Sequence, residues 1–112
     1  MIEKVLLDYL NASELSVKAY AQRPENEPKS YVLIDKTGSE RTNKIEAATI
    51  AIQSYAPTLF EAASLNEEVK AIMDEFVEEP SVGRVRLATD YNFTSTTAKR
   101  YRYQAVYNIT HY

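Results

Sequence analysis

Two segments near the end of the sequence alternate apolar and polar residues at nearly every second position. The apolar set is Val85, Leu87, Tyr91 and Phe93 in 84–93, followed by Tyr101, Tyr103, Ala105, Tyr107 and Ile109 in 100–109. The polar positions between them carry four arginines, namely Arg84, Arg86, Arg100 and Arg102. A period of two residues places alternate side chains on opposite faces of a β-strand. The pattern therefore predicts two strands, each with an apolar face toward the core and an opposite face that carries arginine.

A helical pattern precedes these strands, at 58–77. It opens with "TLFE" (58–61), in which Thr58 and Glu61 have the spacing of a capping box. Apolar residues then recur at steps of three and four, and we expect five of them to face the sheet: Leu65, Val69, Ile72, Met73 and Phe76. The other face of this predicted helix is acidic and carries Glu67, Glu68, Asp74 and Glu75.

The rest of the chain supplies one more helix and three more strands. Apolar spacing predicts a helix at 1–12 and strands at 16–20, 31–36 and 44–56, whereas the polar stretches 21–30, 37–43 and 94–99 are expected to be loops. The order α-β-β-β-α-β-β predicts an α+β fold, in which two helices pack on a mostly antiparallel, curved sheet. A chain of 112 residues is expected to form one domain, spanning 1–112.

The net charge and the residue counts argue against several classes of protein and of binding site. A net charge of −3 argues against a general nucleic-acid binder, because such proteins gain affinity by neutralising phosphates. The sequence has no cysteine, one histidine and two glycines, so disulfides, thiolate metal sites and glycine-rich phosphate loops are excluded. No apolar run approaches the roughly 20 residues that span a membrane. We therefore expect a soluble cytoplasmic protein without cofactor, metal or catalytic residues, and not an enzyme.

The arginines and tyrosines of the last strands have several interpretations. We expect Tyr101, Tyr103 and Tyr107 to be buried on one side of their strand. If the two strands pair, the four arginines share the other face, where like charges repel unless they are neutralised. Solvent and salt, a phosphate backbone or an acidic protein surface could each neutralise them. In a head-to-tail ring the acidic surface is the predicted helix of a neighbouring copy.

Three stretches of the sequence together resemble a known family. They are "RPENEPKSYVLIDKTGSE" (23–40), "ATIAIQSYAPTLFEAASLNEEVKAIMDE" (48–75) and "DYNFTSTTAKRYRYQAVYNITHY" (90–112). The chain resembles the tail terminators, or tail-to-head joining proteins, of long-tailed phages and prophages of Gram-positive bacteria, which are also labelled minor tail or capsid components. The resemblance covers nearly the whole chain and includes no catalytic motif.

This resemblance implies an α/β fold with two helices against a curved sheet. It also implies a structural virion protein of the phage neck, assembled in the host cytoplasm. It implies a hexameric ring that caps the tail tube, stops its polymerisation and joins tail to head. The implied partners are further copies of the chain, the tail tube protein and a head-completion or connector protein, with DNA passing through the lumen without sequence recognition and no membrane. The resemblance supplies no active-site residues, so the residues of the ring contacts are inferred from charge and alternation.

Two sets of residues are therefore candidates for contact. The predicted subunit interface joins the four arginines to the acidic helix face (Arg84, Arg86, Arg100, Arg102, Glu67, Glu68, Asp74, Glu75). The predicted tube or connector contacts lie in the polar loops (Arg23, Glu25, Glu27, Ser39, Glu40, Arg41, Thr96, Lys99). The alternatives are another head–tail connector or a small nucleic-acid-binding module, although predicted tyrosines and arginines on opposite faces argue against the latter.

Overall fold

The computed structural model describes residues 1–94 and 100–112. Its elements, in chain order, are α1 (Ile2–Ala12), β1 (Ala19–Tyr20), β2 (Tyr31–Thr42), β3 (Ile45–Ala56), α2 (Leu59–Met73), the 3₁₀ turn η1 (Phe76–Glu78), β4 (Val82–Asn92) and β5 (Tyr101–His111). The predicted α+β class, element order and mostly antiparallel sheet are confirmed.

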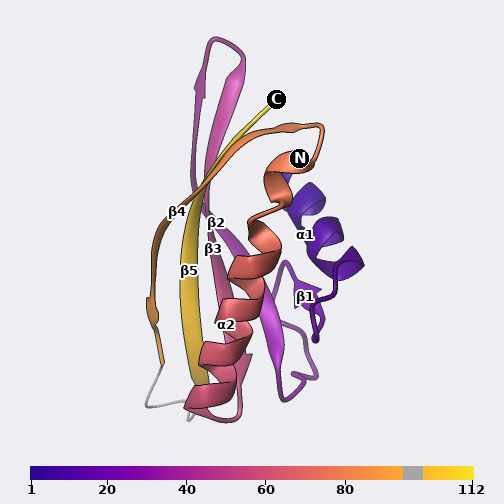
Figure 1. The fold of residues 1–112 in the computed structure, drawn as a ribbon, viewed down its shortest axis with the longest axis vertical. Helices are drawn as coiled ribbons and strands as arrows, with labels where there is room; N and C mark the ends of the chain where they lie inside the picture. Colours follow the sequence, from indigo (N-terminus) through magenta and orange to yellow (C-terminus); the bar gives the residue numbers. More distant parts are fainter. Residues whose placement is uncertain (95–99) are drawn as a thin grey trace.

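One five-stranded sheet forms the centre of the molecule, in the order β1-β2-β3-β5-β4. β2, β3, β5 and β4 pair antiparallel, and the two-residue β1 pairs parallel to β2. β3 is central, as its apolar sequence on both faces requires. Both helices lie on the same side of the sheet (Figure 1). We call this the covered face and the other side the open face.

The core lies between the helices and the covered face. From α2 and η1, the buried residues include Leu65, Val69, Met73 and Phe76, as predicted, while Ile72 is partly buried. α2 ends at Met73 and η1 follows it, so the predicted helix of 58–77 is shorter than expected. Its predicted N-terminus is confirmed, because the Thr58 hydroxyl accepts a hydrogen bond from the Glu61 amide at 3.2 Å. From the sheet, Ile50, Ile52 and other covered-face residues complete the core.

The predicted loop at 37–43 is wrong, because β2 continues through it to Thr42. The actual turn is Asn43 and Lys44, which both have positive φ, as a two-residue type I′ hairpin turn requires. Both faces of the strand are exposed at 37–42, so its residues are polar and the sequence pattern there is that of a loop. The β2–β3 hairpin consequently projects beyond the rest of the molecule (Figure 1), and we call residues 37–46 the arm.

A bulge in β4 changes the predicted alternation of its second half. The register shifts between Leu87 and Thr89, after which Asp90 pairs with Ala105 and Tyr91 pairs with Gln104. Asp90 therefore lies on the covered face, within reach of Lys70, whereas Tyr91 lies on the open face. The sequence predicted the reverse for these two residues. An inserted residue reverses every later side chain, and nothing in the local sequence marks the bulge.

The three tyrosines of β5 differ in burial more than predicted. Tyr107 is buried against the core, Tyr103 is half-buried, and Tyr101 is 38% exposed. Tyr101 pairs with Ala56 at the end of β3, where the sheet ends. The prediction that all three are buried is therefore correct only for Tyr107.

Candidate functional site

The open face carries the four arginines, as predicted, but not as a continuous strip. Antiparallel pairing places Arg84 opposite Thr110 and Arg86 opposite Asn108, whereas Arg102 lies at the other end of β5. Six residues separate 102 from 108, which is about 20 Å along a strand. The expectation that the arginines repel one another across the two strands is therefore wrong. They form two separate pairs, Arg84 with Arg86 and Arg100 with Arg102.

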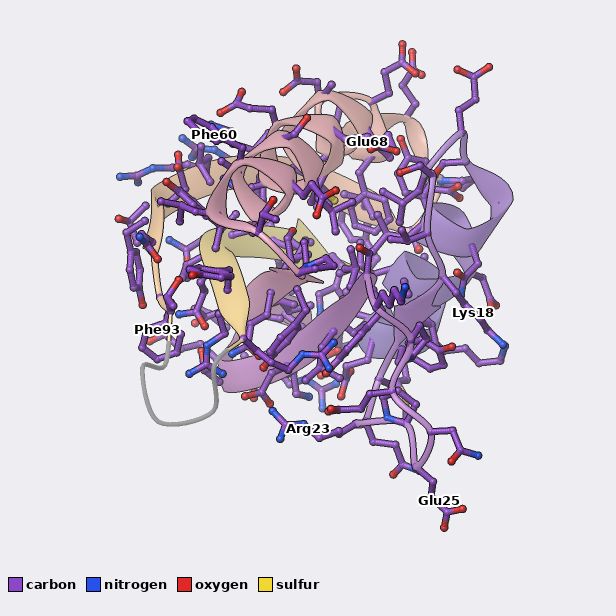
Figure 2. The ribbon with its side chains drawn as sticks, turned by 90° about the horizontal axis from the view of Figure 1, so that it is seen from below. Lys18, Arg23, Glu25, Phe60, Glu68 and Phe93 are labelled. Carbon is purple, nitrogen blue, oxygen red and sulfur yellow. The ribbon has the colours of Figure 1, made fainter. Side chains whose placement is uncertain are left out.

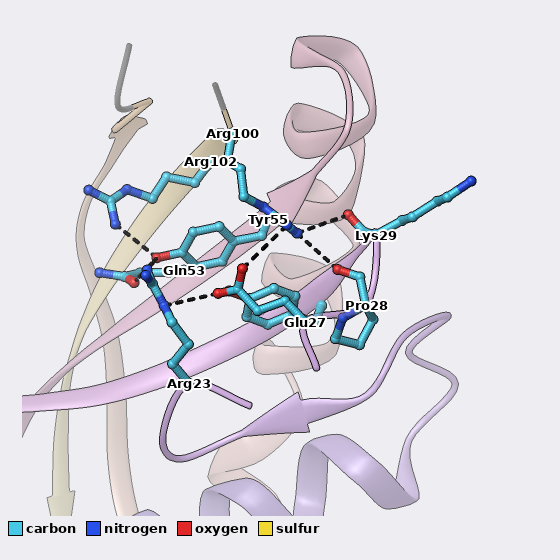
Figure 3. Close-up of polar contacts among 9 residues, drawn as sticks. Arg23, Glu27, Pro28, Lys29, Gln53, Tyr55, Arg100 and Arg102 are labelled. Atoms are coloured by element: carbon cyan, nitrogen blue, oxygen red, sulfur yellow. Dashed lines mark hydrogen bonds and ion pairs between the residues drawn. The ribbon is translucent and has the colours of Figure 1, made fainter. Parts of the chain in front are cut away.

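The second pair is part of a polar and aromatic cluster that fastens the 21–30 loop to the sheet (Figure 3). We define the arginine–tyrosine cluster as Arg23, Glu27, Tyr31, Tyr55, Arg100 and Arg102. At its centre the rings of Tyr31 and Tyr55 are stacked, with centroids 4.7 Å apart and planes 9° apart. These two residues are neighbours because β2 and β3 pair them in register. Both rings are buried although they lie on the open face, because the loop covers them.

The hydroxyl of Tyr55 is the point at which the cluster's hydrogen bonds converge. It accepts from Arg102 Nη1 at 2.8 Å and from Arg23 Nη2 at 3.2 Å, and it donates to Gln53 Oε1 at 3.0 Å. The chain of bonds continues from the Gln53 amide to Gln104 Oε1 at 2.8 Å. A phenol hydroxyl with two donors and one acceptor has its hydrogen-bonding capacity filled.

Glu27 is the anion of the cluster. Its carboxylate lies 3.1 Å from Arg23 Nε and 3.4 Å from Arg100 Nη1, and it accepts the Tyr31 hydroxyl hydrogen bond at 2.9 Å. Arg100 also donates to the Pro28 carbonyl at 2.9 Å. Arg102 lies 4.2 Å above the Phe93 ring and donates to its carbonyl at 2.6 Å. Arg100 therefore has an ion pair within the chain. Arg102 is held within the chain by hydrogen bonds and ring contacts, without a carboxylate partner among the described residues.

Burial and the Glu27 hydrogen bond raise the pKa of Tyr31 to about 12. An unfolded tyrosine ionises near pH 10, so the folded state favours the protonated phenol. The stability this provides is complete below pH 10 and is lost as pH rises from 10 to 12. We expect the unfolding free energy of Tyr31→Phe to fall less steeply across that window than that of the parent, measured by urea titration. Tyr112→Phe, at a side chain 73% exposed, is the control, and equal slopes in both variants would contradict the prediction.

The acidic residues of the predicted interface lie on the covered side of the molecule. Two of them are engaged within the chain: Glu67 pairs with Lys70 at 2.7 Å, and Glu68 accepts a hydrogen bond from the Ser16 hydroxyl at 2.9 Å. Asp74 and Glu75 are exposed just after α2. No ion pair joins these acids to the four arginines in the described residues, although Asp74 and Arg84 both line a depression of about 260 Å³ beside β4.

The predicted contact loops separate into three groups. Arg23 and Glu27 belong to the arginine–tyrosine cluster, whereas Glu25 points away from the body into solvent (Figure 2). Ser39, Glu40 and Arg41 are exposed on the arm, on a strand and not in a loop. Thr96 and Lys99 lie outside the described residues.

Sequence reasoning missed Tyr31, Tyr55, Gln53 and Gln104, which hold the cluster together. One signal was available in the sequence: Tyr31 lies at the start of the predicted strand 31–36, and Tyr55 lies near the end of the predicted strand 44–56. Antiparallel pairing of these two strands brings such residues together. The register itself was not determined by the sequence.

A depression lies between the two helices on the covered side of the molecule. It has a volume of about 660 Å³ and is lined by Tyr9, Glu14 and Glu75 together with small and apolar residues. Burial, and next the charge of Glu75, raise the pKa of Tyr9, whose hydroxyl donates to the Ile72 carbonyl at 2.7 Å. The Tyr9 hydroxyl therefore donates to the backbone and not to either glutamate of the depression. In residues 1–94 and 100–112, no group of three histidine or acidic residues could hold a metal ion. No helix in the same residues is both long and apolar enough to cross a bilayer.

Comparison with known proteins finds no family model that matches this chain and no curated protein that matches it.

Proposed function

We propose that this protein is a ring-forming tail terminator of a phage neck, which caps the tail tube and joins it to the head. The observation that carries the proposal is the agreement between the fold and the fold that the resemblance implies. Two helices cover one face of an open, mostly antiparallel sheet in the order α-β-β-β-α-β-β. The three stretches that carry the resemblance supply the arm, the central strand with α2, and the last strand.

The shape supports assembly of several copies. The sheet is open, so its two edges lie on opposite sides of the molecule, and the arm projects from one end (Figure 1). A single-domain chain of this shape has surface for two neighbours and for a partner above or below the ring. The exposed Arg84 and Arg86 give the open face a positive end, which suits a lumen that conducts DNA.

Mass in solution and tube length test the proposal. We expect a particle of six times the 12.8 kDa chain mass, visible as rings by negative-stain microscopy. Added to the tail tube protein encoded in the same gene cluster, the protein should stop elongation and shorten the tubes. A protein that stays monomeric at every concentration, or that leaves tube length unchanged, would contradict the proposal.

A second candidate is a small single-strand nucleic-acid-binding module. The bulge in β4 places Tyr91 on the open face, and Phe93 lies beside Arg102 there, so exposed rings and arginines share one surface. Stacking on aromatic rings beside a positive groove is how such modules bind. Fluorescence anisotropy with a labelled single-stranded oligonucleotide at two salt concentrations separates the candidates. Binding by the monomer that weakens steeply with salt supports the module and not the ring.

A further inference from the structure

The two edges of the sheet that remain unpaired in the described residues are complementary in strand direction and in charge. β4 pairs only with β5 in the described residues. The Val82 N–H donates to the Glu79 carbonyl at 2.9 Å, and beyond it the outer edge of β4 is open through Asn92. β1 covers β2 only at Val32 and Leu33, so the outer edge of the arm is also open. Unpaired backbone N–H and C=O groups of this kind are a template for another strand.

The two edges have the right strand directions for one another. Successive antiparallel pairings place β2 and β4 in opposite directions at the two sides of the sheet. A second copy, related by rotation about an axis along the strands, would therefore add its β4 antiparallel to the first copy's β2. The contact joins two different surfaces, so it repeats from copy to copy and closes into a ring when the rotation permits.

One row of residues across the sheet shows the charge complementarity. Glu40 pairs with Ala47, Ala47 with Thr110, and Thr110 with Arg84. These residues share the open face, because cross-strand partners lie on the same face. The next row runs from Gly38 through Thr49 and Asn108 to Arg86, and the Thr49 hydroxyl donates to Asn108 Oδ1 at 3.0 Å within it. The first row thus begins with an acid at one edge and ends with a base at the other.

We propose that the arm of one copy pairs edge to edge with β4 of the next, with Glu40 beside Arg84 and diagonal to Arg86. The proposal rests on the ring-forming function proposed above and names its subunit contact. Glu40, Arg84 and Arg86 are exposed, and none has an ion pair with another described residue. The open face of the arm is also unobstructed at Gly38, where an added Cβ would meet no atom within 4 Å.

This contact replaces the interface expected from the sequence. Arg100 and Arg102 are held in the arginine–tyrosine cluster, and Glu68 is bonded to Ser16. Arg84 and Arg86 remain as the basic partners, and Glu40 replaces the acids of α2. Charge at such a contact sets register and rejects wrong pairings, while the backbone bonds of the added strand supply the attachment.

Disulfide trapping tests the pairing directly, because the natural chain has no cysteine. Within one chain, Glu40 and Arg84 are three inter-strand spacings apart, about 14 Å, which is beyond the reach of a disulfide. The variant Glu40→Cys with Arg84→Cys should therefore form only bonds between copies, and a ladder of oligomers on a non-reducing gel. The control variant is Glu40→Cys with Glu14→Cys, which places the second thiol on an exposed residue of the α1 side. It should give about tenfold less disulfide-linked oligomer.

Charge reversal provides a second test of the pairing. Glu40→Arg should weaken ring formation about tenfold or more, because like charges then face one another, and Glu40→Arg with Arg84→Glu should restore it. Glu25→Arg makes the same charge change at an exposed loop residue and should have no effect. Rings that form without the ladder, and that tolerate Glu40→Arg, would overturn the pairing but leave the ring. A parent protein that never assembles would overturn both.

Discussion

Replacing Phe76 with alanine should lower the free energy of unfolding by about 3–5 kcal/mol, as large-to-small changes of a buried aromatic do. Phe76 is fully buried in η1, and its ring lies 4.9 Å from that of Tyr9 on α1. It therefore connects the end of the second helix to the first helix and to the sheet. Deleting the ring leaves a cavity at a junction of three elements, which cannot close without moving one of them.

Phe60→Ala is the matched control, because the Phe60 side chain is 87% exposed on α2. Its removal should change stability by less than about 0.5 kcal/mol, as exposed substitutions usually do. Urea unfolding followed by circular dichroism measures both variants. If Phe76→Ala lost no more than Phe60→Ala, the position of η1 against α1 would be wrong.

The sequence was sufficient for the elements that one-sided burial specifies. The three–four spacing of Leu65, Val69 and Met73 can satisfy only a helix with one apolar face, and these residues form the buried face of α2. Phe76 follows in η1 and is buried against the same core. The same applies to Val85 and Tyr107, whose alternation predicts strands against a core. In these segments the local pattern and the tertiary packing require the same structure, so the prediction needed no knowledge of the neighbours.

The arm, the bulge and the cluster depend instead on partners distant in the sequence. Arm residues 37–42 form a strand because β3 pairs with them, although their polar side chains resemble a loop. The bulge after Leu87 depends on the register with β5. The arginine–tyrosine cluster needs Glu27 to meet Arg100, which is 73 positions away. Charge and alternation alone therefore predicted that the arginines share a face, but not which of them are already bonded within the chain.

The two arginine pairs should consequently respond in opposite ways to charge reversal. Arg100→Glu with Arg102→Glu removes the bonds to Pro28 and the Tyr55 hydroxyl and places two carboxylates near Glu27. Because of these contacts, we expect the free energy of unfolding to fall by at least about 3 kcal/mol, since each hydrogen bond to a charged group contributes roughly 1.5–3 kcal/mol.

Arg84→Glu with Arg86→Glu makes the same charge change on the same face. These side chains are exposed and have no ion pair with any described residue, so the stability of the monomer should change by less than about 0.5 kcal/mol. Assembly should nevertheless be lost, because Glu40 of the neighbouring copy would then face two acids. Urea titration of dilute protein measures the first effect and light scattering at high concentration the second.

Equal stability losses in the two double variants would mean that the cluster does not hold the fold together. A ring that survives Arg84→Glu with Arg86→Glu would exclude the β4 edge from the contact, and the open face would then be read as the lining of the lumen alone.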